Sequence, residues 1–159
     1  MIEEIKNGTY TTCSGSYNNY FVKIYDNLNK EFDGAKLKQS DKMLFGFIDY
    51  SCRLNRKCTW SNEAFVDNTG LSLSQIKSSL NNLEGAGLIT REKRTNGKVI
   101  NIADGIELSK TFIKMYTQVS QNTDMTINDK FIYTVIHHLA DGLNGNCLAK
   151  NSKIAERAG

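Results

Sequence analysis

The sequence predicts an α+β fold, mainly α, organised around two consecutive helices and a β-hairpin in the middle of the chain. Three observations carry this prediction. Ser61 stands where a side-chain cap would start a short helix, expected over Asn62–Asn68. Ser72 and Gln75 have the S-x-x-Q spacing of a capping box at the start of a longer helix. Asn96-Gly97, between two β-prone runs, favours a tight hairpin turn.

The longer helix is expected over residues 73–86, because aliphatic side chains recur there at helical spacing. Its predicted buried stripe comprises Leu73, Ile76, Leu80 and Leu83. Gly85-Ala86-Gly87 then ends the helix. The hairpin is expected over residues 88–102, where β-prone runs flank the turn. These elements predict a helix-turn-helix that is followed by a two-stranded ribbon.

The elements before this stretch rest on weaker signals. Residues 1–19 are rich in small polar residues without a sustained period, so we expect an irregular arm. Residues 20–25 are β-prone and predict a short strand. Ser40 is the expected cap of the next helix, which has Asp41 in its first turn. The apolar face of that helix is formed by Leu44, Phe47, Ile48 and Cys52.

The segment after the hairpin repeats the residue types of the segment before it. Phe112–Tyr116 matches Phe21–Tyr25 position by position. At nearly the same spacing, Asp129–Tyr133 matches Asp41–Phe45. The agreement continues to the last residues, because Asn151 and Gly159 correspond to Asn62 and Gly70. A repeat of this kind indicates two related structural units.

The repeat predicts three parts: an arm over 1–19, a complete unit over 20–104, and residues 105–159. The last part is expected to hold a helical connector, Ile106 to Met115, and helices 1 and 2 of an incomplete second unit. Because two helices alone leave apolar faces uncovered, we expect the sequence to be a fragment of a longer protein. The alternative is that residues 106–159 form a helical extension, or swap between copies in a homodimer.

Composition and charge argue against several functional classes. The 159 residues are 40% hydrophobic and 23% charged, with a formal net charge of +3, as in ordinary globular proteins. No window approaches the roughly 18 apolar residues that a membrane helix needs, and the acidic start of the chain is unlike a signal peptide. The 4 cysteines form no C-x-x-C pair and suit a reducing cytoplasm. We expect no metal site, no cofactor and no enzyme, because His137 and His138 point apart on a helix and no catalytic motif is present.

The longer helix carries a polar face that suits contact with a DNA duplex. The residues expected to contact DNA there are Ser72, Ser74, Gln75, Lys77, Ser78 and Asn81. Side chains of these types bond base edges or phosphates in the major groove, and the first helical turn offers free N–H groups. The alternative is an ordinary solvated helix face. The order of helix, turn, helix and hairpin favours the DNA contact.

The hairpin adds positive charge beside that helix. The residues expected to contact DNA there are Arg91, Lys93, Arg94, Asn96 and Lys98. Cations on such a ribbon replace the counterions of phosphates along the backbone or the minor groove. The alternative is that they only discourage edge-to-edge pairing between molecules. The clustering of four cations around one turn favours the contact with DNA.

The residues of this stretch resemble a known family. The runs are Ser61-Asn62-Glu63-Ala64-Phe65 and Leu80-Asn81-Asn82-Leu83-Glu84-Gly85-Ala86-Gly87-Leu88-Ile89. They resemble the winged helix-turn-helix domains of plasmid and phage replication initiators and of mobile-element regulators. The resemblance implies a protein of the bacterial cytoplasm or nucleoid that binds double-stranded DNA in replication initiation. The alternatives are a transcriptional repressor of a mobile element, and a protein-interaction winged helix that does not bind DNA.

Overall fold

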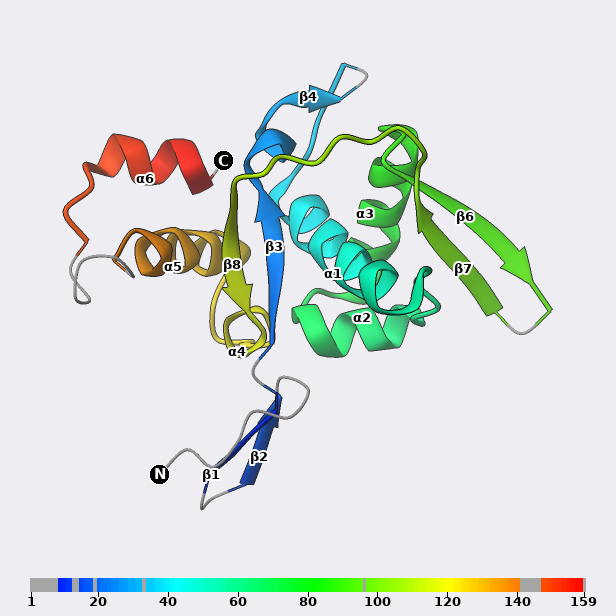
Figure 1. The fold of residues 1–159 in the computed structure, drawn as a ribbon, viewed down its shortest axis with the longest axis horizontal. Helices are drawn as coiled ribbons and strands as arrows, with labels where there is room; N and C mark the ends of the chain where they lie inside the picture. Colours follow the sequence, from blue (N-terminus) through cyan, green and yellow to red (C-terminus); the bar gives the residue numbers. More distant parts are fainter. Residues whose placement is uncertain are drawn as a thin grey trace.

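The structure, a computed structural model, describes residues 9–12, 15–18, 20–32, 34–95, 97–140 and 147–158. Its fold is α+β and mainly helical, as predicted (Figure 1). The strands are β1 (Thr9–Thr12), β2 (Gly15–Asn18), β3 (Phe21–Tyr25), β4 (Glu31–Phe32), β5 (Ala35–Lys36), β6 (Ile89–Arg94), β7 (Gly97–Ile102) and β8 (Phe112–Tyr116). The helices are η1 (Asp26–Asn29), α1 (Gln39–Asn55), α2 (Asn62–Thr69), α3 (Leu73–Gly85), α4 (Thr117–Ser120), α5 (Ile127–Ala140) and α6 (Asn151–Ala158).

Three helices and a hairpin follow one another in the predicted order. α3 packs on α1, and β6 and β7 form an antiparallel ribbon that extends away from the helices (Figure 1). The loop between α1 and α2 joins this ribbon, because Cys58 and Ile100 exchange backbone hydrogen bonds of 2.9 and 2.8 Å. Arg94 pairs with Gly97, so Gly97 already belongs to β7. The predicted turn residue Asn96 lies outside the described residues.

Local side-chain caps start α2 and α3, as the sequence predicts. Ser61 Oγ accepts a backbone hydrogen bond of 3.1 Å in the first turn of α2. Ser72 and Gln75 exchange the two bonds of a capping box, 2.9 and 3.2 Å long. Trp60 packs on Phe65 with 5.5 Å between the ring centroids, which is the contact of a hydrophobic staple. The sequence around each start therefore determines where the helix begins.

The start of α1 differs from the prediction. α1 begins at Gln39 with Lys38 as its N-cap residue, so Ser40 lies inside the first turn and is not the cap. The carboxylate of Asp41 accepts the backbone N–H of Lys38 at 2.9 Å. This bond satisfies a donor that the start of a helix leaves free. Asp41 therefore takes the role that we expected of Ser40.

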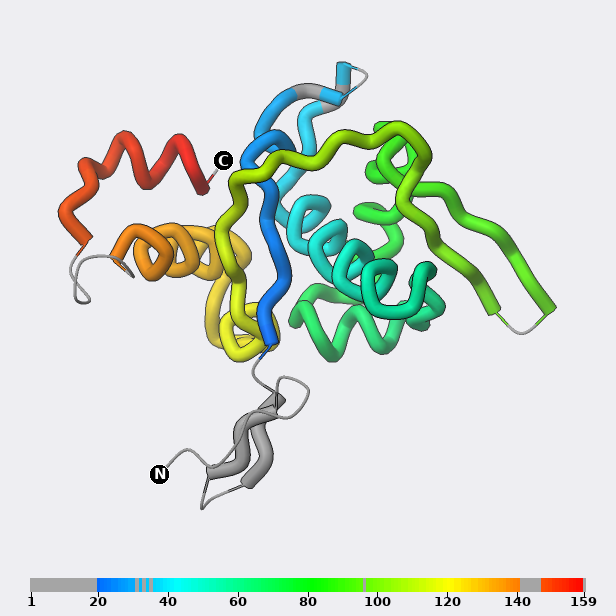
Figure 2. The backbone as a smooth tube through the Cα atoms, in the orientation of Figure 1, coloured from blue at the N-terminus to red at the C-terminus, as the bar shows by residue number. Residues whose placement is uncertain are grey.

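Two predictions outside the helix-turn-helix are wrong. Residues 106–111 have no regular secondary structure, and the residues that follow form β8, so Ile106 to Met115 is not a helical connector. After β7 the chain crosses the molecule and returns beside β3, with which β8 pairs in antiparallel fashion (Figure 2). Within the arm over 1–19, where we expected no regular structure, β1 and β2 form an antiparallel hairpin.

β3 and β8 are related by an approximate two-fold axis at the centre of their register, where Lys23 pairs with Lys114. The contacts on the two sides of this centre match. Lys23 Nζ lies 4.3 Å from the ring centroid of Phe112, and Lys114 Nζ lies 5.1 Å from that of Phe21. The ring pairs Phe21–Tyr116 and Tyr25–Phe112 both have 6.0 Å between their centroids. The two strands are thus equivalent in structure as well as in sequence.

One hydrophobic core runs through both halves of the chain. It includes Ile24 of β3, Phe47 of α1, Leu80 of α3, Met115 of β8 and Val135 of α5. We call residues 20–104 the first segment and residues 105–158 the second segment. Each contains a strand, a long helix and a shorter helix in the same order: β3, α1 and α2 in the first, β8, α5 and α6 in the second. None of the described helices has both the length and the apolar composition to cross a membrane.

Candidate nucleic-acid interface

α3 buries one face and exposes the other. Ile76, Leu80 and Leu83 are buried as predicted, but Leu73 is 41% exposed and was wrongly assigned to the buried stripe. Helical side chains lean towards the N-terminus, so the first residue of α3 covers the surface before the helix instead of the core beneath it. The six polar residues expected to contact DNA are all exposed: Ser72, Ser74, Gln75, Lys77, Ser78 and Asn81.

Three of these six residues also have structural partners. Ser72 and Gln75 form the capping box, which occupies the Gln75 carbonyl oxygen Oε1. Asn81 Oδ1 accepts a hydrogen bond of 2.8 Å from Arg91 Nη2. Within the described part of the chain, the structure gives Ser74, Lys77 and Ser78 no hydrogen-bond partner. These last three side chains are the ones most available to a ligand.

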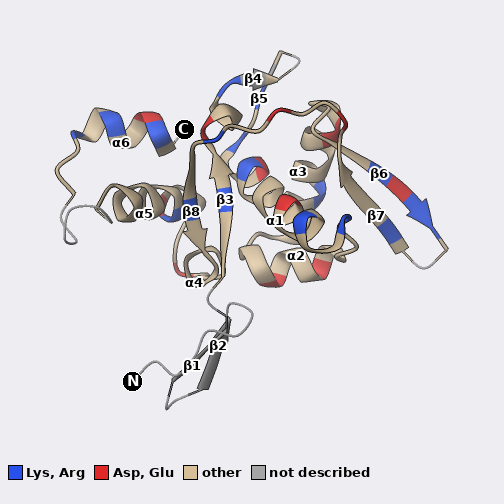
Figure 3. Cartoon of the chain, in the orientation of Figure 1, with Lys and Arg blue, Asp and Glu red and all other residues tan. Residues whose placement is uncertain are grey.

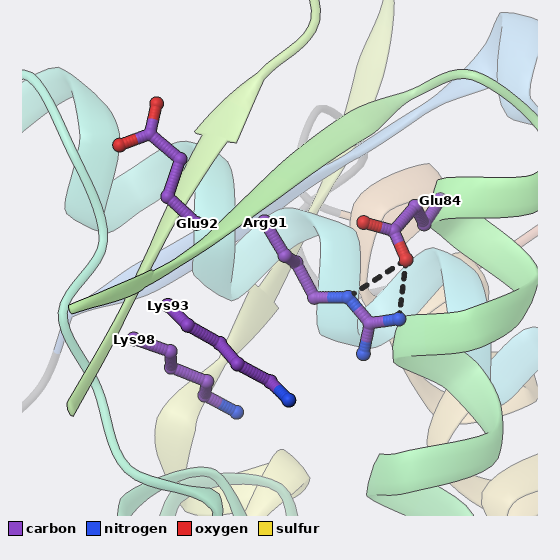
Figure 4. Close-up of a pocket in the computed structure, with 5 residues that line it drawn as sticks. All are labelled: Glu84, Arg91, Glu92, Lys93 and Lys98. Atoms are coloured by element: carbon purple, nitrogen blue, oxygen red, sulfur yellow. Dashed lines mark hydrogen bonds and ion pairs between the residues drawn. The ribbon is translucent and has the colours of Figure 1, made fainter.

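The C-terminal end of α3 is fixed to its neighbours by two polar contacts. Asn82 Nδ2 donates to the carboxylate of Asp41 on α1 at 3.2 Å. Arg91 on β6 donates to Glu84 Oε2 through Nε at 3.0 Å and also through Nη2 (Figure 4). The hydrogen bond from Arg91 lowers the pKa of the Glu84 carboxyl, so this group stays ionised. Arg91 therefore ties the ribbon to α3, and its charge is partly neutralised.

The cations of the ribbon lie on two different faces. Lys93 pairs with Lys98 across the ribbon, and Arg91 is two residues before Lys93, so these three share the face turned towards α3 (Figure 4). Glu92 and Arg94 lie on the opposite face and form an ion pair of 3.2 Å. In Figure 3 the acidic segment of β6, in red, lies between basic segments, in blue. The structure thus brings together three of the four predicted cations and separates Arg94 from them.

A hollow of about 300 Å³ lies between the ribbon and the end of α3. Its lining residues are Glu84, Arg91, Glu92, Lys93 and Lys98. Lys98 also lines a second hollow beside the start of α2, where its Nζ bonds Asn62 Oδ1 and lies 5.7 Å from the Phe65 ring centroid. Burial, followed by the positive charge of Arg91, lowers the pKa of the Lys98 ammonium. Lys98, close to the turn of the ribbon, therefore ties the ribbon to the start of α2, while Lys93 is the more exposed cation.

Besides Glu84 and Glu92, Glu63 at the start of α2 adds negative charge near this face. Hydrogen bonds from its own backbone N–H and from Ser61 lower the pKa of the Glu63 carboxyl, and the charges of Lys98 and Lys77 lower it further. Asn62, the neighbour of Glu63, accepts the hydrogen bond of Lys98, so the start of α2 lies against the ribbon. Asn62 and Glu63 were not among the residues expected at this surface, and the pairing of Lys98 with Lys93 differs from the register that an Asn96-Gly97 turn would give.

Two cysteines, Cys52 and Cys58, lie beside this surface. Among the residues that the structure describes, no three His, Cys, Asp or Glu side chains are grouped to hold a metal ion. Burial raises the pKa of the Cys58 and Cys52 thiols, so they stay protonated at neutral pH.

Comparisons with protein-family models, with curated proteins and with solved structures found no match to this chain.

Proposed function

We propose that this protein binds double-stranded DNA, with α3 in the major groove and the β6–β7 ribbon as a basic wing along the neighbouring backbone. One observation carries the proposal: the ribbon face that bears Lys93 and Lys98 lies beside α3, whose exposed side is polar (Figure 4). The order of α1, α2, α3 and the ribbon, with Cys58 joined to β7, supports a winged helix-turn-helix assignment.

In this proposal the side chains of α3 divide into two groups. Ser74, Lys77 and Ser78 contact bases or phosphates directly, because nothing described in the protein occupies them. Gln75 contributes its amide nitrogen Nε2, since its oxygen caps the helix. Asn81 orients Arg91 and contacts DNA only through its remaining amide group. Loss of Gln75 therefore weakens the start of the helix as well as any base contact.

The test of DNA binding is its salt dependence. Binding of the whole chain to a duplex of mixed sequence is measured by fluorescence anisotropy between 50 and 200 mM salt. Three or four phosphate contacts give a log–log slope of about −3, because each contact releases close to one counterion. A slope near zero would overturn the proposal and favour a winged helix that binds protein. Lys93→Ala should make the slope shallower by about one.

Arg94→Ala is the matched control for Lys93→Ala. The two side chains are neighbours on β6 and both are exposed, but Arg94 faces away from α3 and pairs with Glu92. The control should change the slope by less than half as much. Equal effects of the two substitutions would show that the ribbon attracts DNA only through its net charge, without the proposed orientation.

For the process served, we propose initiation of plasmid or phage replication, which the sequence resemblance implies. The protein would be used to select its preferred DNA sequence from a random pool. Copies of that sequence would then be searched for in the DNA around the gene. Several copies of the selected sequence in tandem would support initiation. A single copy over the gene's own promoter would support the alternative, repression of transcription by the same contacts.

A further inference from the structure

The turn between α2 and α3 is held by residues of the second segment. Lys130, near the start of α5, is only 2% exposed. Its ammonium donates to the carbonyl of Thr69 at 3.0 Å and to that of Ser120 at 2.6 Å. The hydroxyl of Ser120 donates to the carbonyl of Asn68 at 2.8 Å. Two side chains of the second segment therefore bond the last two carbonyls of α2.

These bonds have a clear electrostatic cause. The last carbonyls of a helix have no partner within the helix, and they carry its negative dipole end. Thr69 is the last residue of α2 and Ser120 the last of α4, so Lys130 places one positive charge where two helix ends meet. Among the described residues, the structure records no carboxylate ion pair for Lys130. The carbonyl groups supply the compensation for its buried charge.

The contact is close enough to fix the turn itself. Gly70 has φ +65°, and a Cβ atom there would lie 2.8 Å from Lys130 Nζ and 3.2 Å from the Ser120 carbonyl oxygen. The next residue, Leu71, donates its N–H to Thr69 Oγ1 at 3.2 Å. Ser72 then caps α3. Only Gly70 and Leu71 therefore separate Thr69, whose carbonyl is bonded, from Ser72, the cap of α3.

The two ends of α3 are held by different segments. Its C-terminal end is tied to the first segment, through Asp41 on α1 and Arg91 on β6. Its N-terminal end follows the turn that Lys130 holds. We propose that Lys130 is a positioning residue, through which the second segment sets the orientation of the first turn of α3 and thereby its discrimination between DNA sequences. This inference rests on the proposed function, because it assigns sequence reading to α3.

The chain offers a matched control at Lys42. This lysine is 1% exposed and occupies on α1 the place that Lys130 has on α5. Its ammonium donates at 2.8 Å to Asn29 Oδ1, at the end of η1. That contact lies within the first segment and does not involve the α2–α3 turn. Lys42→Met and Lys130→Met therefore both remove a buried ammonium, but only the second removes hydrogen bonds that hold the α2–α3 turn.

The first readout is the discrimination between a selected and an unselected DNA sequence. Each variant is titrated with a duplex selected from a random pool and with an unselected duplex at the same salt. Lys130→Met should lower the ratio of the two affinities about tenfold, while its affinity for the unselected duplex changes less than twofold. Lys42→Met should leave the ratio within twofold of the wild type. Equal ratios in the two variants would overturn the proposal.

The second readout needs no DNA. Hydrogen exchange of the amides at positions 71–76 should be about tenfold faster in Lys130→Met and unchanged in Lys42→Met. If the wild type fails to bind DNA, the proposed function fails, and unchanged exchange in Lys130→Met would separately exclude its role in holding the turn. Should Lys130→Met not fold, Ser120→Ala removes one hydroxyl, which bonds the carbonyls of Asn68 and Thr117. It should shift both the ratio of affinities and the exchange rate about threefold. No shift in either would overturn the proposal.

Discussion

The long helices α1 and α5 occupy equivalent places in the two segments. The same apolar face is covered on α1 and partly exposed on α5. This face carries Leu44, Phe45 and Ile48 on α1, and their counterparts on α5 are Ile132, Tyr133 and Ile136. The three on α1 are 0% exposed, whereas those on α5 are 42%, 49% and 38% exposed. α3 packs on α1, and no described helix lies in the matching position on α5. Similar apolar patterns therefore give a core only where a third helix covers them.

The largest difference between the segments should appear on truncating this face. Ile48→Ala should lower the free energy of unfolding by about 3–4 kcal/mol, because it opens a cavity in a packed core. Ile136→Ala should cost less than about 1 kcal/mol, because its side chain already meets solvent. Urea denaturation of both variants provides the comparison. Similar losses would mean that the α5 face is covered in solution.

The contact between the segments should give the next largest effect. Gly70→Ala should cost about 2–3 kcal/mol, because a left-handed backbone and the nearby Lys130 ammonium both oppose a Cβ atom. Gly105→Ala is the control, with φ +78° and no atom within 4 Å of the added Cβ, and should cost about 1 kcal/mol. Urea midpoints at constant pH measure both. Equal costs would show that the two segments do not press together at this turn.

The paired strands should instead behave alike. Lys23→Ala and Lys114→Ala should each cost about 0.5–1 kcal/mol, because each removes a cation–π contact and a cross-strand neighbour. Thermal unfolding of the single variants should give shifts that agree within error. A shift in only one of them would contradict the two-fold equivalence of β3 and β8.

One further difference between the segments should appear only in alkali. Burial raises the pKa of Tyr20 to about 12, and the position matching Tyr20 in the second segment is Thr111, which does not titrate. Between pH 10 and 12 the unfolded phenol ionises while the folded one stays neutral, so stability falls as pH rises. Tyr20→Phe should reduce this fall and leave the pH dependence below pH 9 unchanged. Urea titrations at pH 8, 10 and 11 test it, and identical slopes for variant and wild type would refute it.

Sequence reasoning succeeded where the determining contacts are local. Ser61, Ser72 and Gln75 cap helices through bonds within three residues, and each appears where the pattern predicts it. The start of α1 was missed although Asp41 also acts over three residues, because a carboxylate inside the helix can do the work expected of a preceding serine. Helix starts are thus predictable once both kinds of cap are considered.

Other errors arise where contacts between distant parts of the chain determine the local structure. The helical connector expected over Ile106 to Met115 instead ends in β8, because residues from Phe112 onward pair with β3. The repeat with Phe21–Tyr25 contained that information. At the candidate interface, the polar residues of α3 could be chosen from the sequence, but the division of the ribbon cations could not. It depends on the hairpin register, which separates Lys93 from Arg94.

The pairing of β3 with β8 also sets an order of events during synthesis. Phe21 leaves the ribosome 91 residues before Phe112, its counterpart. At about 5–20 residues per second this delay is roughly 5–18 s. Throughout that time β3 has an unpaired edge, which exposes it to pairing with other nascent chains. The growing chain must therefore protect its first core strand, by early packing of α1 or by a chaperone, until the partner strand emerges.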